Sequence, residues 1–450
     1  MNYRAIYVGV IAVFISIIIV YTIISVKQSE VIGRLTDKKI TAQKLNSDLD
    51  YLLHTIAAIN PDPYHNTSKD RISSLTNQIK GKLKDPMTGI EFFRLISPLI
   101  SAYNDAHLVV NNGLYFKEFE QAGGRLFPLS VIIDPNINRI FLKATVGKNQ
   151  NISKGKELVS INNISCKSIL DKLSQLYPGD SEAYKVAILE NGFAICLWKE
   201  FGFNGSFRIL FKDGSSETVK GLFVADWLNI RKRKVFFECK CLQDHGQDIA
   251  YIKLSSLEYE KKQQFDGFLV KSFENIHQWG CRSLIIDIRS NFGGSTLLAK
   301  QLFNYITKNP YSIEWENKSF KNGKLITEGD RKLTTPELEE NKFTGKVYLL
   351  VNATTFSSAY MMANAFKFYK LGTVIGDIGS EKMLVSGEPI FFTLPNSQIN
   401  GFCPSSFFLL PNTLGKDSRL IPDHVVVQSF EDRLQDKDVQ LDFCFKLIGG

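Results

Sequence analysis

The N-terminal quarter of the chain carries apolar residues at helical spacing. Between positions 45 and 59, leucine and isoleucine return every three or four residues, which is typical of one face of an amphipathic helix. Asn60-Pro61-Asp62-Pro63 interrupts this run, because proline cannot continue a helix interior. Two more runs at helical spacing cover 68–83 and 90–103. We therefore expect a helical region from residue 29 to residue 125.

From residue 127 the pattern changes to the short apolar runs that are typical of β-strands. The strand-like runs lie at 127–133, 139–144, 206–212 and 217–222. Among them, a turn glycine, a strand ending at Asn162 and a helix near 166–176 resemble the carboxylate-binding region of a PDZ domain. In such a domain a peptide adds as a strand to an exposed sheet edge. We expect a PDZ-like β-rich domain over 126–222, with an ordinary small β-rich insertion as the alternative.

The rest of the chain, 223–450, alternates apolar strands with amphipathic helices. The strand-like runs lie at 249–254, 284–288, 347–351 and 373–376, and the helical runs at 265–279, 297–306 and 358–369. This alternation predicts a layered α/β core with parallel strand pairing.

The first residues of the chain form a long uncharged segment. Ala5 to Ser25 contains no charged residue, and as a helix it reaches about 30 Å, the thickness of a bilayer core. A cleaved signal peptide is the competing interpretation, but Tyr21-Thr22-Ile23-Ile24-Ser25 has no small-x-small cleavage site. We therefore expect residues 1–28 to be an uncleaved, single-pass membrane anchor. Basic residues flank both ends, so charge does not set its orientation.

Composition excludes several classes of function. The chain is 44% apolar and 22% charged, which favours a folded body over disorder. The one dense basic cluster, Arg231-Lys232-Arg233-Lys234, has no interleaved aromatic residues, so we expect no nucleic-acid partner. The seven cysteines are irregularly spaced and odd in number, so a disulfide framework is not indicated. Neither H-E-x-x-H nor paired C-x-x-C occurs, and we expect no metal or organic cofactor.

Two strand-to-helix junctions carry candidate chemistry. The first is Asp287-Ile288-Arg289-Ser290-Asn291-Phe292-Gly293-Gly294, where paired glycines can point backbone N–H groups at a developing oxyanion. A tight turn that simply needs glycine is the alternative. The second junction holds Ser357 after the strand at 347–351, a position from which side chains reach the carboxyl end of a sheet. The alternative is that Ser357 or Thr355 only caps the following helix.

A nucleophilic serine needs a base, and the sequence offers two candidates. Lys382 follows the predicted strand at 373–376, and a desolvated lysine can be neutral and accept a proton. His107 follows the helical run at 90–103, and a neutral imidazole suits the same role. The alternatives are that Lys382 is an ordinary surface lysine and that His107 has only a structural role.

Taken together, these elements resemble the C-terminal processing (tail-specific) serine peptidases and their tricorn-like relatives, of the S41 type. Residues 287–294 resemble the D-L-R-x-N-x-G-G element of that family, 355–359 its T-x-S-A-[SA] element, and 376–382 its G-E-x-T-x-G-K element. Leu394-Pro395-Asn396-Ser397 and Ile421-Pro422-Asp423 match later elements, and all five occur in family order. The resemblance implies a crotonase-like α/β peptidase core and no cofactor.

The resemblance also implies roles for individual residues. Ser357 is then the nucleophile, and the amides of Ser358 and of Gly293 or Gly294 form the oxyanion hole. Lys382 is the base in the processing-protease version and His107 in the tricorn-like version. Substrates are then peptides or proteins with free C-termini, bound in part by the PDZ-like domain, and the catalytic part lies on the extracytoplasmic (periplasmic) side of the cell membrane.

The sequence departs from the family pattern at three positions. Glu381 replaces a glycine before the lysine, Ala106 replaces a glycine before the histidine, and Tyr360 stands where the family often has glutamate. The choice between Lys382 and His107 therefore stays open, with Asp417 as a candidate to orient His107. A catalytically impaired peptide-binding protein on the same scaffold is the alternative function.

Overall fold

The computed structural model describes residues 38–134, 136, 138–145, 152–232, 235–244, 246–321, 323–329, 331, 333–337 and 339–450. The expected anchor at 1–28 lies outside the described residues, as do Arg233 and Lys234 of the basic cluster. Within the described ranges, none of the helices is both long and apolar enough to span a bilayer.

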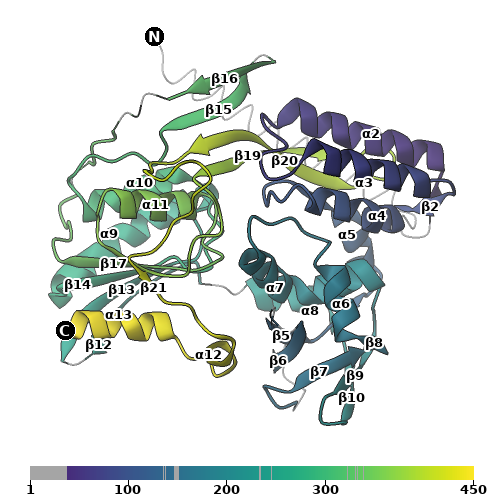
Figure 1. Cartoon of the computed structure of the whole chain (residues 1–450). Helices are drawn as coiled ribbons and strands as arrows, with labels where there is room; N and C mark the ends of the chain where they lie inside the picture. Colours follow the sequence, from purple (N-terminus) through teal and green to yellow (C-terminus); the bar gives the residue numbers. More distant parts are fainter. Residues whose placement is uncertain are drawn as a thin grey trace.

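The helical region lies where the periodicity predicts it (Figure 1). Its helices are α2 (Ala42–Ile59), α3 (Lys69–Lys82), α4 (Gly89–Ser101) and α5 (Gly113–Gln121), with short strands β1 (Lys39–Ile40), β2 (Met87–Thr88) and β3 (Val109–Asn111). The helix ends follow the local sequence, since α2 stops before Pro61, Ser68 caps α3, and Thr88 with Glu91 forms a capping box on α4.

An antiparallel sheet follows, as the strand-like runs predict. Its strands are β5 (Leu129–Asp134), β6 (Arg139–Thr145), β7 (Glu157–Ile161), β8 (Ile164–Ser165), β9 (Ser206–Phe211) and β10 (Ser216–Lys220). The order is β10-β9-β7-β6-β5, so β5 is an edge strand, and β8 pairs with β7. A small pair, β4 (Arg125–Leu126) with β11 (Leu222–Phe223), and helix α8 (Val224–Lys232) complete this region.

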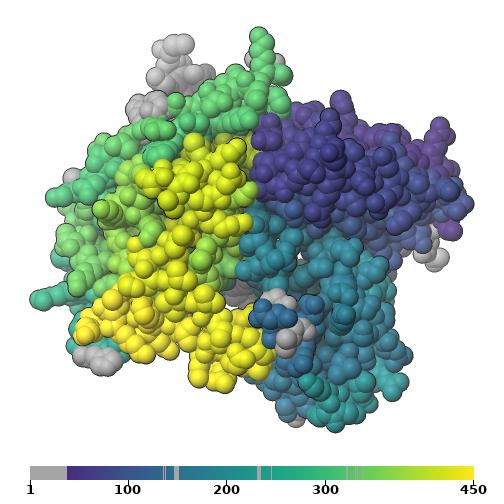
Figure 2. Space-filling model, in the orientation of Figure 1, coloured from purple at the N-terminus to yellow at the C-terminus, as the bar shows by residue number. Residues whose placement is uncertain are grey.

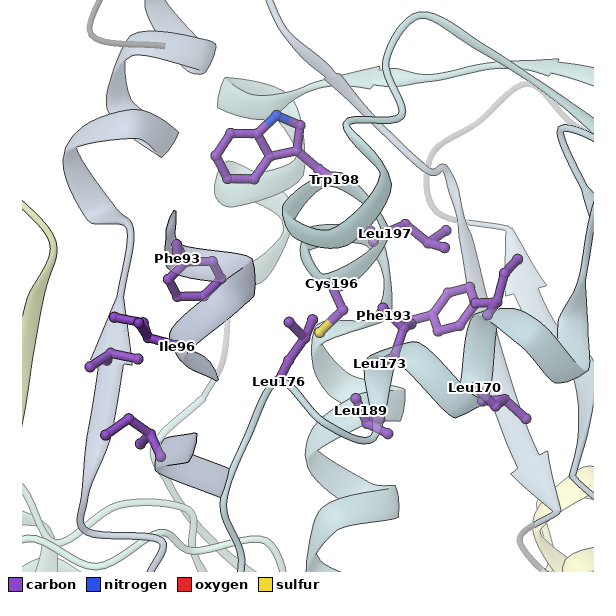
Figure 3. Close-up of a cluster of buried hydrophobic side chains, with 14 of the residues drawn as sticks. Phe93, Ile96, Leu170, Leu173, Leu176, Leu189, Phe193, Cys196, Leu197 and Trp198 are labelled. Carbon is purple, nitrogen blue, oxygen red and sulfur yellow. The ribbon is translucent and has the colours of Figure 1, made fainter. Parts of the chain in front are cut away.

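Helices α6 (Cys166–Leu173) and α7 (Glu182–Phe201) pack this sheet against the helical region. Figure 3 shows side chains of α4 facing those of α6, α7 and the segment between them across one apolar cluster. The periodicity did not predict α7, because its buried residues surround the helix rather than forming one stripe. One of them, Lys199, donates hydrogen bonds to Tyr177 Oη at 2.7 Å and Asn111 Oδ1 at 3.1 Å.

The core is a layered α/β structure, as expected. Its sheet has the order β12-β13-β14-β17-β18-β21, and only the β12–β13 pair is antiparallel. The strands are β12 (Phe237–Asp244), β13 (Gln247–Leu254), β14 (Ser283–Asp287), β17 (Lys346–Val351), β18 (Thr373–Gly376) and β21 (His424–Val425). Helices α9 (Lys262–Trp279), α10 (Thr296–Ile306) and α11 (Ser358–Phe368) cover one face, and α13 (Val439–Gly449) covers the other.

A second sheet connects the core to the helical region. It contains β15 (Glu316–Lys321), β16 (Lys324–Glu328), β19 (Leu384–Thr393) and β20 (Asn400–Leu409), and β3 adds to β20. In Figure 1 the β19–β20 hairpin reaches from the core to helix α2. Its tip is held by the buried Asp48 of α2, which accepts hydrogen bonds from the amides of Asn396 at 3.0 Å and Ser397 at 2.7 Å. The Leu394–Ser397 element is therefore an anchor point of the hairpin.

Candidate active site

Ser357 lies at the turn between β17 and α11, with φ 54° and ψ −129°. This conformation is strained for a residue with a side chain, at about 1–3 kcal/mol, and is expected of a nucleophile on a sharp strand-to-helix turn. The Ser357 side chain is half-buried and makes no capping hydrogen bond to α11. The hydroxyl of Thr355 instead donates to the Ile288 carbonyl at 3.1 Å. The alternative that either residue only caps the helix is therefore not supported.

The glycine junction after β14 is hydrogen-bonded directly to this turn. The amide of Phe356 donates to the Asn291 carbonyl at 2.9 Å, and the Ser358 hydroxyl donates to the Gly294 carbonyl at 2.7 Å. The approach is close enough to require glycine, since a Cβ on Gly293 would lie 2.8 Å from both Ser357 Cβ and the Ser358 nitrogen. Two turns that are more than 60 residues apart in sequence thus hold each other in place.

The hydrogen bonds distinguish the two glycine amides. Gly293 N–H donates to the Asn291 side-chain oxygen at 2.9 Å. Within the described part of the chain, the amides of Gly294 and Ser358 donate to no protein acceptor. Ser358 is buried and Gly294 is exposed. An amide that has no protein acceptor can donate to an incoming oxyanion, so these two amides are the candidates for that role.

Asp287 and Arg289 of the same motif anchor the glycine junction from behind. Arg289 Nε donates to Asp287 Oδ1 at 2.9 Å, and Arg289 Nη2 donates to Asp438 Oδ2 at 2.8 Å. Asp438 in turn caps helix α13. The motif therefore ties the junction to the C-terminal helix through charge-assisted hydrogen bonds.

His107 lies against the turn that holds Ser357, in the loop before β3. Its ring stacks on Phe356, the residue before Ser357, with ring centroids 4.6 Å apart. Its Nδ1 lies 3.1 Å from the hydroxyl of Ser386 on β19. Burial lowers the pKa of His107, although nearby Asp105 opposes the shift. A neutral imidazole is the form that a general base requires.

Lys382 points away from the cluster around Ser357. Its Nζ lies 3.1 Å from Asp417 Oδ1, in a pair that is partly solvent-exposed. Its neighbours Glu381 and Met383 are buried, as expected where side chains of an extended segment alternate in direction. Asp417 is thus the partner of Lys382 rather than of His107, and the carboxylate nearest His107 is that of Asp105, 4.0 Å from Nδ1.

Glu381 is a site residue that the sequence interpretation missed. Its carboxylate accepts a hydrogen bond from the Ser357 amide, and its side chain is almost fully buried. Burial, with the nearby carboxyl of Asp180, raises its pKa well above the usual range. Burial also raises the pKa of Asp180 to about 7. The alternation around Lys382 could have indicated that the residue before it faces inward.

Tyr360, one of the three departures from the family pattern, positions Glu381. Its hydroxyl donates to the Glu381 carbonyl at 2.7 Å and accepts a hydrogen bond from the Leu420 amide at 2.9 Å. Its ring lies where a Cβ on Gly379 would be, at 2.4 Å. Tyr360 therefore has a structural role that is compatible with an intact site.

The edge of the antiparallel sheet β10-β9-β7-β6-β5 is occupied at Ile133 on β5. The Ile133 amide donates to Glu190 Oε1 of α7 at 2.7 Å, and its carbonyl accepts from Arg433 Nη2 at 3.0 Å. Arg433 belongs to α12 (Phe430–Leu434) and also pairs with Glu190 at 2.9 Å. Figure 2 shows this C-terminal segment, in yellow, lying against the teal domain. A peptide that adds to β5 at this point must replace both side chains.

Comparisons with known proteins agree with this geometry. Residues 248–398 match the model of peptidase family S41, and these residues include Ser357 and the glycine junction. No curated protein sequence matches the chain. Within the described residues, no group of three or more His, Cys, Asp or Glu side chains is arranged to hold a metal ion.

Several solved structures share the fold. A CPAF mutant gives a TM-score of 0.67 at 11% identity, covering 90% of this chain and 97% of that chain. Mature CPAF gives 0.64 at 14% identity, covering 90% and 97%. Mature CPAF complexed with lactacystin gives 0.64 at 13% identity, covering 90% and 98%. The family match covers Ser357 and the glycine junction but not His107, and it indicates a hydrolase of the S41 type. The solved structures show that the fold is shared along most of the chain.

Proposed function

We propose that the protein is a serine endopeptidase of the C-terminal-processing type that works through an acyl-enzyme on Ser357. The observation that carries the proposal is the strained turn at Ser357. The amides of Ser358 and Gly294 at this turn have no acceptor among the described residues, and Phe356 of the turn stacks on the buried His107. Strain of this kind persists where the surrounding structure holds it for function. No metal or organic cofactor takes part in the proposed reaction.

In the proposed mechanism, His107 is the general base. It accepts the Ser357 proton as Oγ attacks the scissile carbonyl, and the amides of Gly294 and Ser358 donate to the resulting oxyanion. The protonated imidazole then gives its proton to the leaving amine, and the acyl-enzyme forms. Water, deprotonated by His107, attacks the ester and releases Ser357. His107 is preferred over Lys382 because Lys382 is paired with the exposed Asp417.

Peptides and proteins are the substrate class that the family suggests. The finer proposal, cleavage near a free C-terminus with help from the PDZ-like domain, is supported by the order of the sequence elements. The uncharged segment from Ala5 to Ser25 supports a membrane anchor with the catalytic part outside the cytoplasm. Alkaline extraction of membranes that carry the full chain tests this anchor, and recovery of the chain in the soluble fraction would contradict it.

The direct test uses the full chain in detergent and an unstructured protein with a free apolar C-terminus. We expect the wild type to cleave it, and Ser357→Ala to lose about 10⁵-fold or more in kcat. A serine-reactive fluorophosphonate should label the wild type and not Ser357→Ala. Cleavage by Ser357→Ala at the wild-type rate would rule out the mechanism.

A second function, peptide binding without catalysis, is favoured by one observation. The Glu381 carboxyl contacts the amide of the nucleophile itself, and its negative form would oppose an oxyanion nearby. Its raised pKa reduces this opposition by favouring the neutral form. Saturable binding of the test substrate, without cleavage or labelling of the wild type, would establish this second function.

A further inference from the structure

The hydroxyl of Ser386 lies between the two polar side chains of the loop before β3. Ser386 Oγ is 2.7 Å from Asp105 Oδ1 and 3.1 Å from His107 Nδ1. Asp105 Oδ1 is 4.0 Å from His107 Nδ1, which is too long for a hydrogen bond. Ser386 therefore makes the side-chain connection between this carboxylate and the imidazole.

The donors and acceptors of this cluster determine which ring nitrogen carries the proton. A serine hydroxyl has one proton to donate, and an ionised carboxylate can only accept. Ser386 therefore donates to Asp105, and its oxygen accepts from His107, so the Nδ1 atom carries the hydrogen. In a neutral imidazole the other nitrogen, Nε2, is then free to accept a proton.

The surroundings hold this arrangement in place. Asp105, Ser386 and His107 are 1%, 5% and 8% exposed, so water has little access to compete for these hydrogen bonds. Asp105 Oδ1 also accepts the backbone amide of His107 at 2.9 Å, and Asp105 Oδ2 lies 3.8 Å from His65 Nε2. The His107 amide thus fixes Oδ1, whereas Oδ2 has no hydrogen-bond partner within the described residues.

Ser386 reaches this position because β19 belongs to the hairpin anchored on the helical region. Its backbone pairs with Phe407 of β20, and the hairpin tip is held by Asp48 and by the Tyr115 hydroxyl, 2.6 Å from the Ser397 carbonyl. The helical region also leads directly into the loop that carries His107. The helical region therefore positions both His107 and strand β19, which carries Ser386.

We propose that Ser386 is a positioning residue whose hydroxyl connects Asp105 to His107 and holds the imidazole in its Nδ1–H tautomer, with Nε2 as the proton acceptor. The proposal rests on the proposed function, because it assigns His107 as the base. Ser386 does not touch the substrate. It acts by keeping the basic nitrogen of His107 available and the ring in one orientation.

The first test measures cleavage by Ser386→Ala, Ser386→Thr and the control Ser405→Ala. Ser405 lies on the same hairpin, where its hydroxyl donates to the Glu388 carbonyl at 2.7 Å, away from His107. We expect Ser386→Ala to lower kcat by about 10- to 100-fold with KM little changed, as loss of a hydrogen bond to a catalytic group implies. Ser386→Thr, which keeps the hydroxyl, should recover most of that loss, and Ser405→Ala should resemble the wild type.

The second test needs no activity. Nitrogen-15 NMR of histidine-labelled Ser357→Ala protein reports which ring nitrogen of His107 is protonated, with His107→Gln in the same background for assignment. We expect a protonated Nδ1 at neutral pH, and a mixture of tautomers when Ser386→Ala is added.

The outcomes separate the two proposals. A protonated Nε2 in the Ser357→Ala protein would overturn the role of Ser386, and so would Ser386→Ala with wild-type kcat and pH profile. A protonated Nδ1 in a wild-type chain that cleaves nothing would support the connection through Ser386 and would contradict the proposed peptidase function.

Discussion

The two halves of the candidate site are built from different kinds of interaction. The nucleophile half, Ser357 with the amides of Ser358 and Gly294, is fixed by backbone groups at the ends of two adjacent parallel strands. The base half, His107 with Asp105 and Ser386, is fixed by side chains that lie about 280 residues apart in sequence. The first half thus depends on the core sheet, and the second depends on how the helical region meets the β19–β20 hairpin.

The largest expected effect separates the two candidate bases. His107→Ala should lower kcat/KM by about 10³- to 10⁴-fold, because general-base catalysis contributes on this scale. Lys382→Ala removes only a partly exposed ion pair with Asp417, so its effect should stay within about twofold. Both are measured by steady-state cleavage of the same substrate. If Lys382→Ala were the damaging change instead, His107 would not be the general base.

The next effect tests the nucleophile half. Gly294 has φ +139°, and a Cβ there would lie 2.2 Å from the Leu257 carbonyl oxygen. Gly294→Ala should therefore move an oxyanion amide and lower kcat by about 10²- to 10³-fold.

Gly267→Ala is the matched control for that change. Gly267 lies in helix α9 with no atom within 4 Å of an added Cβ. The Gly267→Ala variant should keep full activity, and its free energy of unfolding should rise by up to about 1 kcal/mol. If Gly294→Ala cleaves as fast as this control, the Gly294 amide is not part of the oxyanion hole.

A smaller effect tests whether the base half depends on the helical region. Asp48→Ala leaves the buried amides of Asn396 and Ser397 without their acceptor, at a cost of about 1–3 kcal/mol in the free energy of unfolding. Asp50→Ala on the same helix removes an exposed pair with Lys80 and should cost under about 1 kcal/mol. Urea denaturation compares the two variants, and equal midpoints would show that the Asp48 contact does not hold the hairpin.

The smallest effect is a shift in pH dependence. The base must be neutral, and burial lowers the pKa of His107 from its ordinary value of 6.5. The acid limb of kcat/KM should therefore lie below pH 6.5, because the imidazole loses its proton at a lower pH than a free histidine. Measuring kcat/KM between about pH 4 and 8 covers this limb. An acid limb above pH 6.5 would show that another group controls the step.

The contrast between the half built from backbone groups and the half built from distant side chains explains what could be predicted from the sequence. The parallel strands, and the position of Ser357 at a strand-to-helix turn, were predictable, because an apolar run followed by a turn and a helix is a local pattern. Helix α2 ends at Ile59, with Asn60 as its C-cap, as the prolines after it indicated. The resemblance to the S41-type peptidases, which rests on local elements in order, is likewise confirmed.

The surroundings of the base were not predictable in this way. Ser386 and Asp105 meet only through tertiary packing. The β19–β20 hairpin carries Pro389 opposite Pro404, and prolines argue against a strand when only the sequence is read. Glu381 was noticed as a departure from the family pattern, but its contact with the Ser357 amide depends on how the chain turns after β18. The role of Ser357 as nucleophile, the choice of base and the oxyanion amides stay predictions.

The contact between Arg433 and the β5 edge has a consequence for synthesis of the chain. Ile133 leaves the ribosome roughly 300 residues before Arg433, a delay of about 15–60 s at ordinary elongation rates. During that time its carbonyl cannot receive the Arg433 hydrogen bond that completes the folded edge. An uncovered edge strand is a template for pairing with another chain. The nascent protein therefore passes through a period in which neighbouring copies on one message can associate through β5, and synthesis of α12 brings that period to an end.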